Sequence, residues 1–328
     1  MEVGLIFVLL LILGAEFVNG WTDSPNAIAT VVGTRSLTPL QAVIMAAVLN
    51  LLGVLSGTKV AATIGKGIVD ASVIDLTTVA GAMISIIIWS TLAAQWGIPT
   101  SESHALVAGL AGAGLATAGP NALLWEGWRK VLLGLVFSSF FGTLGGMALM
   151  IAVYWIFRRA KPAQVRGKFR VLQIISSGFM AFAHGSNDGQ KFMGVFTLAL
   201  VISGALPAFQ IPLWVILICA SVMALGTLTG GWRIIQTMGM KLTRLETHQG
   251  FSAEIAAATT IEVATRFGIP LSTTHTITSA IVGVGATRGG SAVNWGMTQR
   301  IVMAWILTFP ICGLISWAVV LGLRAIAR

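Results

Sequence analysis

Long apolar stretches recur along the whole chain, and short polar connections separate them. About 20 helical residues cross a bilayer, so the longer stretches predict membrane-spanning helices. Several are shorter than a full crossing, which is how helices broken inside the membrane look in a hydropathy pattern. The stretches are Val3–Phe17, Leu40–Leu55, Leu76–Trp96, Val131–Phe157, Val171–Ala183, Phe192–Leu206, Leu213–Thr227 and Ile301–Leu323.

Two further segments have a different pattern. Ile98–Ala118 and Ile269–Thr287 are rich in Gly, Ala, Ser and Thr, and each has a proline near its start and one histidine. Small residues also suit two closely packed spanning helices, but the shared proline-led start favours the tips of re-entrant hairpins. The sequence therefore predicts an all-α polytopic membrane protein with broken helices and two re-entrant helical hairpins.

Composition supports this class and argues against others. Of the 328 residues, 56% are hydrophobic and 9% are charged, with a mean hydropathy of +0.89, whereas soluble domains carry about 25% charge. The net charge of +9 lies in short connections, where cytoplasmic loops accumulate Lys and Arg, so it does not indicate a nucleic-acid partner. Cys219 and Cys312 lie in apolar segments without metal-ligand spacing, which indicates inert core thiols.

The first apolar stretch follows Met1-Glu2 with no basic residue before it and no Ala-x-Ala site after it. A secretory signal needs both features. We therefore expect a retained first helix, in a multi-pass protein of the cell membrane.

The two halves of the chain repeat the same landmarks in the same order. Asp23 matches Asp188, residues 63–65 match 237–239, and residues 99–104 match 270–275. A near-constant offset indicates an internal duplication, with repeats at residues 1–157 and 171–328. Between them, residues 158–170 hold six basic residues and no acidic one, which predicts a cytoplasmic linker. An inverted arrangement is favoured because it brings paired half-helices face to face at the membrane midplane.

A polar run interrupts the apolar pattern near the start of each half. Residues 183–191 read Ala-His-Gly-Ser-Asn-Asp-Gly-Gln-Lys, and residues 19–26 read Asn-Gly-Trp-Thr-Asp-Ser-Pro-Asn. Irregular polar backbone inside a membrane is tolerated where it lines a cavity enclosed by protein. Two such breaks at corresponding places therefore indicate one buried site, which is the pattern of a transporter built from inverted repeats.

The aspartates in these runs need a compensating charge. An ionised carboxylate in a bilayer costs at least about 2.5–3.5 kcal/mol, which a bound cation or a proton offsets. Hard cations prefer oxygen ligands, and Asp23 and Asp188 would be the sodium ligands if sodium is the ion. An ion pair between Asp188 and Lys191 is the alternative. The candidate ion-site residues are Asp23, Asn26, Asn187 and Asp188, with Thr22 and Gln190 beside them.

The hairpin motifs offer hydroxyl donors in place of carboxylates. Hydroxyls and backbone N–H groups at a helix N-terminus form an anion site without a full positive charge, although Ser and Thr at such places also serve as helix caps. The candidate anion ligands are Ser101, Ser103, Ser272, Thr273 and Thr274. His104 and His275 end the two motifs and are either hydrogen-bonded structural residues or proton carriers. For Glu254 and Glu262, gating, pairing with Arg266 and exposure to water all stay open.

These motifs together resemble the inorganic phosphate transporter (PiT) family over essentially the whole chain. The resemblance rests on residues 184–191, their copy at 19–26, the two Pro-x-Ser-x-x-His motifs, and Gly65-Lys66-Gly67-Ile68-Val69-Asp70. It implies a secondary active transporter that imports phosphate by symport with sodium or protons, uses no other cofactor, and forms a homodimer in the lipid bilayer. It also implies that the Asn-Asp motifs hold the coupling ion and that the hairpin hydroxyls hold phosphate.

The sequence departs from that family at two places. The usual first motif, Gly-Ala-Asn-Asp-x-x-Asn, has Thr22 in place of its first Asn, and Pro25 follows Asp23. Lys191 stands where the first half has Asn26. Both changes reduce the oxygen ligands available to sodium, so the sequence leaves sodium and protons open.

Two other functions are alternatives, and a third is disfavoured. A sulfate permease on the same fold is an alternative, because sulfate only accepts hydrogen bonds whereas phosphate near neutral pH also donates one. An anion channel is a second alternative, because rings of hydroxyls and carboxylates also line pores. An enzyme is disfavoured: Asp23 and Asp188 lack the Tyr-Asp and Gly-x-Gly-Asp motifs of intramembrane aspartyl proteases, and no His-Glu-x-x-His pattern occurs.

Overall fold

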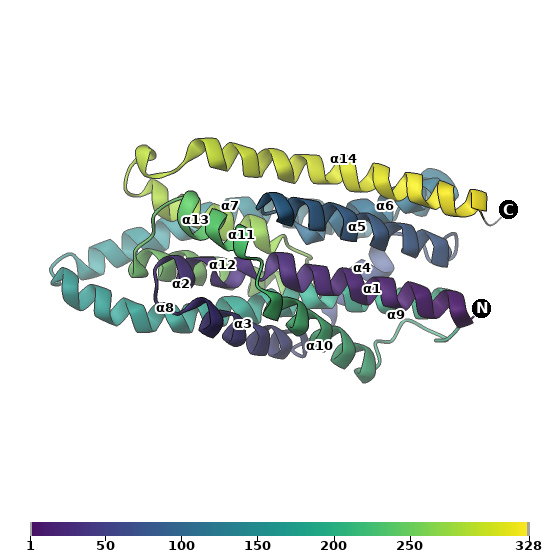
Figure 1. Cartoon of the computed structure of the whole chain (residues 1–328), viewed down its shortest axis with the longest axis horizontal. Coiled ribbons are helices and arrows are strands. Elements are labelled where there is room, and N and C mark those ends of the chain that lie inside the picture. The colour runs from purple at the N-terminus through teal and green to yellow at the C-terminus, as the bar shows by residue number, and fades with distance from the viewer. Residues whose placement is uncertain (1, 327–328) are drawn as a thin grey trace.

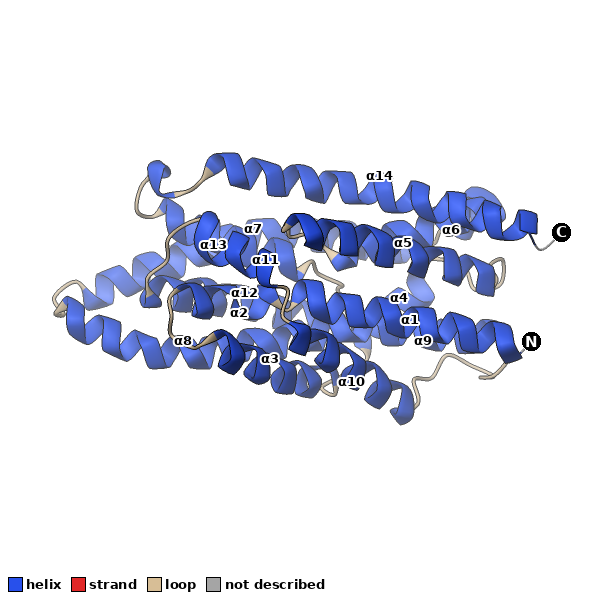
Figure 2. Cartoon of the chain, in the orientation of Figure 1, coloured by secondary structure: helices blue, strands red, loops and turns tan. Residues whose placement is uncertain are grey.

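Long helices lie side by side along one axis of the molecule (Figure 1), and no β-strand element forms within residues 2–326, which the computed structural model describes (Figure 2). The α-helices are α1 (Glu2–Asp23), α2 (Pro25–Gly33), α3 (Pro39–Val54), α4 (Lys59–Gly67), α5 (Leu76–Trp96), α6 (Glu102–Ala118), α7 (Trp125–Phe157), α8 (Pro162–His184), α9 (Gln190–Ile202), α10 (Leu213–Thr229), α11 (Trp232–Gln236), α12 (Thr247–Arg266), α13 (Thr273–Ala286) and α14 (Trp295–Ile326). Short 3₁₀ turns are η1 (Gly119–Ala122) and η4 (Gly290–Ala292), and π-helical turns are η2 (Gly185–Gly189) and η3 (Thr237–Lys241).

Several helices have the length and composition of membrane spans. Within residues 2–326, four qualify directly: Val3–Gly33, α5, α7 and α14. Two bent pairs raise the number to six if each pair is one span: α3 with α4, bent by 70°, and α10 with Trp232–Lys241, bent by 62°. The chain is therefore a multi-pass, all-α membrane protein with broken helices, as the hydropathy pattern predicted.

The helix α12 was not among the predicted stretches, and the two largest boundary differences concern the first span and α8. The first span extends from Val3 to Gly33, because Pro25 stands at the start of α2, where a missing N–H leaves no hydrogen bond unmade. In addition, α8 begins at Pro162, inside the predicted linker, so the irregular connection between α7 and α8 is limited to residues 158–161.

The two halves correspond element by element. The pair α1–α2 matches α8–α9, α3–α4 matches α10–α11 with η3, α5–α6 matches α12–α13, and α7 matches α14. Packing between the halves is reciprocal: α1 packs on α10 and α3 on α8, α4 on α9 and α2 on α11, α6 on α14 and α13 on α7. Matching helices such as α7 and α14 run in opposite directions along the long axis (Figure 1), which is the inverted arrangement.

Close packing of α3 against η2 fixes the central break. A Cβ on Gly53 of α3 would overlap the backbone of residues 182–186, and a Cβ on Gly185 would overlap the backbone of Asn50. Small residues allow two backbones to approach this closely inside a membrane. The π-helical turn, a form common at functional sites, is thereby held in the middle of the bundle with Asp188 on it.

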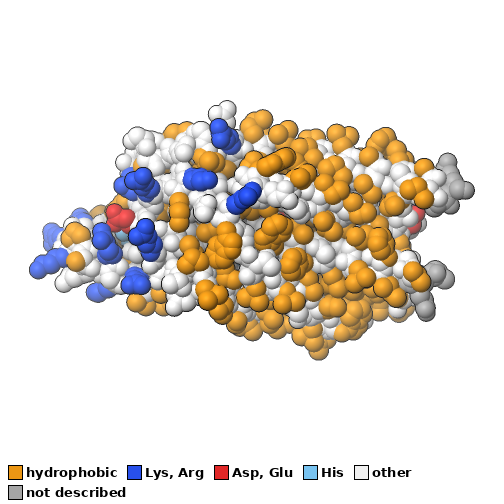
Figure 3. Space-filling view, in the orientation of Figure 1, with side chains coloured by type: hydrophobic (Ala, Val, Ile, Leu, Met, Phe, Trp, Pro, Cys, Tyr) orange, Lys and Arg blue, Asp and Glu red, His pale blue; other side chains and the backbone are white. Residues whose placement is uncertain are grey.

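Charge is distributed unevenly over the surface. In Figure 3, Lys and Arg side chains gather at the end that carries the α7–α8 connection, while hydrophobic side chains cover most of the remaining visible face. Both chain ends lie toward the opposite end of the molecule (Figure 1). Because cytoplasmic loops are enriched in Lys and Arg, the basic end is the expected cytoplasmic end.

Candidate substrate and ion site

The tips of the two helical hairpins meet inside the bundle. One tip joins α5 to α6 and the other joins α12 to α13. Ser103 Oγ, at the start of α6, donates a hydrogen bond of 2.8 Å to the carbonyl oxygen of Leu271 in the opposite tip. The rings of His104 and His275 lie edge to face with centroids 4.4 Å apart. The pairing of the hairpin motifs in sequence is therefore a contact in space.

The carboxylate of Asp188 joins the central break to both hairpins. Lys191 Nζ contacts Asp188 Oδ1 and Ser103 Oγ, and it donates to the carbonyl oxygen of Leu271 at 2.8 Å. Thr273 Oγ1 donates to Asp188 Oδ2 at 2.9 Å. These side chains are buried, and all three ammonium hydrogens of Lys191 have an acceptor. The ion pair that the sequence left open is thus present.

Asp23 and Asn26, from the break in the first half, reach the hairpin of the second half. Thr274 Oγ1 donates to Asp23 Oδ1 at 3.3 Å. Asn26 Nδ2 donates to Thr274 Oγ1 at 3.0 Å and to Thr273 Oγ1 at 3.3 Å. The two Thr hydroxyls therefore lie between the two aspartates, with Thr273 on Asp188 and Thr274 on Asp23.

The two aspartates also approach each other. One ligand atom from each of Asp23, His184 and Asp188 lies within 4.8 Å of the other two. His184 Nε2 lies 3.5 Å from Asp188 Oδ2, and His184 Nδ1 lies 3.0 Å from Asn50 Oδ1. Two carboxylates beside two hydroxyls offer oxygen ligands that suit a hard cation such as sodium. The same pair of carboxylates could instead share a proton.

Three carboxylates surround this site, because Glu102 also belongs to it. Thr22 Oγ1 donates to Glu102 Oε1 and Ser90 Oγ donates to Glu102 Oε2, both at 2.8 Å. Glu102 is 1% exposed. Thr22 is among the site residues predicted from the sequence and Glu102 is not, although an acidic residue within an apolar hairpin motif was the available signal.

Asn187 and Gln190 contact neighbouring elements and not the aspartates. Asn187 Nδ2 donates to Thr265 Oγ1 at 2.7 Å, and Asn187 Oδ1 accepts from the backbone N–H of Leu271 at 3.2 Å. Gln190 Oε1 accepts from the backbone N–H of Val60 at 3.0 Å. Asn187 thus anchors the second hairpin tip, and Gln190 anchors α4.

Ser101 and Ser272 cap the hairpin helices. Ser101 Oγ accepts from the backbone N–H of His104 at 3.3 Å, and Ser272 Oγ accepts from the backbone N–H of His275 at 3.1 Å. This is ordinary N-capping. It fixes where α6 and α13 begin, so that the positive ends of two helix dipoles lie at the meeting point of the hairpin tips.

The two glutamates left open by the sequence have different surroundings. Glu262 pairs with Arg266 at 3.1 Å and accepts from Ser186 Oγ at 3.0 Å. Glu254 is buried between three helices, where hydroxyls and an amide donate to it. Its donors are Thr30, Ser176 and Gln173.

Comparison with known proteins finds relatives along nearly the whole chain. A sequence model described as the phosphate transporter family matches residues 19–316. A protein of Rhizobium meliloti (strain 1021) named a probable low-affinity inorganic phosphate transporter is 45% identical over 316 residues, covering 96% of this chain and 94% of that protein. A protein of Bacillus subtilis (strain 168) with the same name is 39% identical over 317 residues, covering 95% of each.

A solved structure matches the fold as well. It is titled the sodium-dependent phosphate transporter, and it superposes with a TM-score of 0.88 at 27% sequence identity, covering 99% of this chain and 100% of that one. The names of these relatives describe transporters.

Proposed function

Because the chain belongs to the phosphate transporter family, we propose that it imports inorganic phosphate as a secondary active transporter, by symport with a cation that is sodium or a proton. One observation carries the proposal. Thr273 and Thr274, at the start of a hairpin helix, bond to Asp188 and Asp23. The groups suited to an anion thus touch the groups suited to a cation, so binding of one affects binding of the other.

Phosphate is proposed to bind where the hairpin helices begin. The N-termini of α6 and α13 supply backbone N–H groups and helix dipoles, and Ser103, Thr273 and Thr274 supply hydroxyls at the same place. Lys191, which contacts Ser103, adds a full positive charge nearby. Phosphate near neutral pH can also donate a hydrogen bond to a carboxylate, which sulfate cannot do, so this setting suits phosphate better.

The cation is proposed to bind at Asp23. The site holds three buried carboxylates, Asp23, Glu102 and Asp188, and one buried ammonium group, that of Lys191. An uncompensated excess of negative charge is costly within a membrane. Lys191 already pairs with Asp188, and Glu102 accepts two hydroxyl hydrogen bonds of 2.8 Å. Asp23 accepts a longer bond of 3.3 Å from Thr274, so it is the carboxylate that gains most from sodium or a proton. Because Thr274 bonds to Asp23 and is also proposed to bind phosphate, it links the release of phosphate to the release of the cation.

Exchange of access follows from the inverted halves. We propose that residues 1–157 and 171–328 are the two repeats, and that rocking of one helix bundle against the other opens the site alternately to each side. Because both hairpins and both breaks contribute to one site, such a movement changes the contacts of phosphate and cation together.

The test is uptake of radiolabelled phosphate into proteoliposomes under a sodium gradient, a proton gradient, or neither. We expect accumulation above equilibrium that follows one gradient, which names the coupling ion. Equilibration without accumulation would indicate an anion channel and contradict the proposal. Labelled sulfate tests the substrate: sulfate accumulation that phosphate does not compete against would indicate a sulfate permease.

A further inference from the structure

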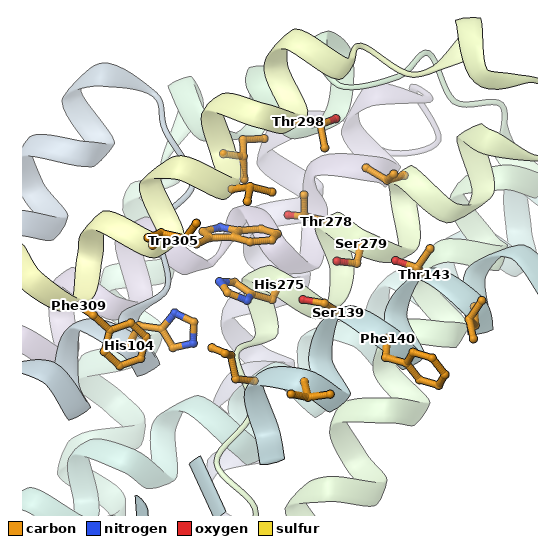
Figure 4. A pocket seen from close by; sticks show the side chains of 17 residues that line it. His104, Ser139, Phe140, Thr143, His275, Thr278, Ser279, Thr298, Trp305 and Phe309 are labelled. Carbon is orange, nitrogen blue, oxygen red and sulfur yellow. The ribbon is translucent and has the colours of Figure 1, made fainter. Parts of the chain in front are cut away.

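A groove of about 830 Å³ is lined by side chains of α7, α13 and α14 together with His104 of α6 (Figure 4). Its walls are apolar side chains that are exposed on the protein surface, among them Val136 and Phe140 of α7 and Ile306 of α14. Ligand sites typically have about this volume and combine apolar walls with a few converging polar groups. None of the proposed phosphate or cation ligands lines this groove.

Unpartnered polar atoms lie at the base of the groove. His104 Nδ1, both ring nitrogens of His275, and Thr278 Oγ1 have no hydrogen-bond partner among residues 2–326. The three side chains are only 3%, 4% and 1% exposed. Trp305 stacks on His275 with ring centroids 3.6 Å apart (Figure 4). Because buried polar groups in native proteins are almost always hydrogen-bonded, these atoms point to a ligand.

The chemistry of these atoms defines the ligand. A neutral imidazole offers one donor and one acceptor, and a Thr hydroxyl offers both, so the complementary group also donates and accepts, as a hydroxyl does. No Lys, Arg, Asp or Glu is among the residues that line the groove, so a charged headgroup would find no counter-charge. We propose that the groove binds a neutral lipid with a free hydroxyl, which bonds to His275 and Thr278 while its apolar chain lies along α7 and α14.

The position of the groove links it to the hairpin tips. His104 directly follows Ser103, and His275 directly follows Thr274. A bound lipid that bonds to His275 therefore lies one residue along the chain from a hydroxyl proposed to bind phosphate. Occupancy of the groove would hold both tips against α14 and would change transport without touching phosphate.

A second groove offers an internal control. It has a volume of about 750 Å³, lies on the other side of α7 against α12, and is also lined mainly by apolar side chains, among them Phe141 and Val263. Two hydroxyls line it: that of Thr260 donates to the carbonyl oxygen of Ala256 at 2.8 Å, and Thr259 is exposed on the surface. The two grooves thus have similar volumes, but among the described residues buried polar atoms without a partner line the first groove and not the second.

The experiment compares photoreactive probes with the protein in lipid nanodiscs, followed by mass-spectrometric mapping of the labelled peptides. The probes are hexadecanol, hexadecane and palmitic acid, each with a diazirine in the chain. We expect hexadecanol to label the first groove in preference to the second, and hexadecane to show no preference. Thr278→Val should lower hexadecanol labelling of the first groove about two- to tenfold, the effect of one lost hydrogen bond, and Thr260→Val should leave it unchanged.

Three results would overturn the proposal: equal labelling of both grooves by hexadecanol, the same first-groove preference with hexadecane, or stronger first-groove labelling by palmitic acid. Labelling of the second groove reports whether a variant is folded. If Thr278→Val loses that labelling too, His275→Phe, which keeps an aromatic ring against Trp305, replaces it with the same expected drop. The readout requires no transport, so it stands or falls separately from the proposed symport.

Discussion

Lys191 gives the site its particular character. It occupies the place that corresponds to Asn26 in the first half, and its ammonium group contacts Asp188, Ser103 and the carbonyl oxygen of Leu271. A symmetric site would have an amide there, free to share in holding a mobile cation. The ammonium group of Lys191 in that place pairs with Asp188. This leaves Asp23 as the partner for an exchangeable cation.

Replacing Asp188 tests this central pair. Asp188→Asn leaves the Lys191 ammonium buried without its carboxylate, and breaking a buried ion pair in this way costs about 3–5 kcal/mol. We expect gradient-driven phosphate uptake to fall at least about 100-fold, a factor that corresponds to the lower part of that cost. Uptake is measured in proteoliposomes at equal protein content. Glu126→Gln, at an exposed carboxylate of α7, is the matched control and should keep full uptake; normal transport by Asp188→Asn would remove this residue from the site.

Replacing Lys191 tests the number of coupling cations. Lys191→Asn restores the residue type of the first half and leaves Asp188 without a fixed partner. Because a buried carboxylate requires compensation, we expect the variant to bind an additional cation per phosphate. The measurement is the dependence of the phosphate accumulation ratio on the cation gradient, which should become steeper than in the unmodified protein. An unchanged slope would mean that Lys191 does not stand in for a transported cation.

At the scale of single elements, the start of α13 can be tested directly by mutation. Ser272 caps this helix through the backbone N–H of His275, and its own N–H donates to Ser138 Oγ at 3.3 Å. Loss of a helix cap costs about 1 kcal/mol, so Ser272→Ala should weaken apparent phosphate affinity about fivefold by loosening the helix N-terminus. Ser272→Thr, which can still cap, should keep the affinity. The concentration dependence of uptake measures both variants, and equal weakening in both would argue against capping as the cause.

Most of the membrane-spanning helices and both hairpin tips could be predicted from the sequence. Hydropathy located the apolar spans because lipid requires apolar side chains on most faces of a span. It did not predict α12 (Thr247–Arg266), which holds few large apolar residues and two glutamates. The proline-led hydroxyl motifs located the hairpin tips, and their repetition predicted that they belong to one site. The family and the all-α membrane fold, both inferred from these motifs, are confirmed.

The remaining details depend on contacts between residues far apart in the sequence. Glu102 was missed because its donors, Thr22 and Ser90, come from two other helices. Asn187 and Gln190 were grouped with Asp188 because they are neighbours in the chain, yet their side chains contact α12 and the start of α4. Local spacing indicates which side chains are polar and buried, but the packing of the helices decides which of them meet.

At the scale of the whole molecule, the inverted halves depend on each other for packing. Gly194 of α9 leaves room for the backbone of Ala61 in α4, and Gly239 of η3 leaves room for the backbone of Ala29 in α2. Each broken helix of one half is thus covered by a broken helix of the other. Neither half can enclose the site by itself, so movement of one bundle relative to the other necessarily alters the site.

The direction of the molecule in the membrane is the last prediction. Residues 158–170 hold six basic residues, which predicts that their end of the bundle lies in the cytoplasm. The opposite end carries Asp75, which pairs with Arg324 near the C-terminus at 2.8 Å. Cys219 and Cys312 are both buried, so a cysteine introduced at the surface can be labelled without background from these two thiols.

Ser72→Cys and Gln164→Cys place one exposed thiol at each end of the bundle. In intact cells, a membrane-impermeant maleimide should label Ser72→Cys, and it should label Gln164→Cys only after the membrane is permeabilised. The opposite labelling pattern would mean that the basic end lies outside the cell, and it would contradict the predicted orientation. With the expected pattern, the α4–α5 loop lies on the side from which phosphate enters, and the basic α7–α8 connection lies where phosphate is released, close to cations that attract it.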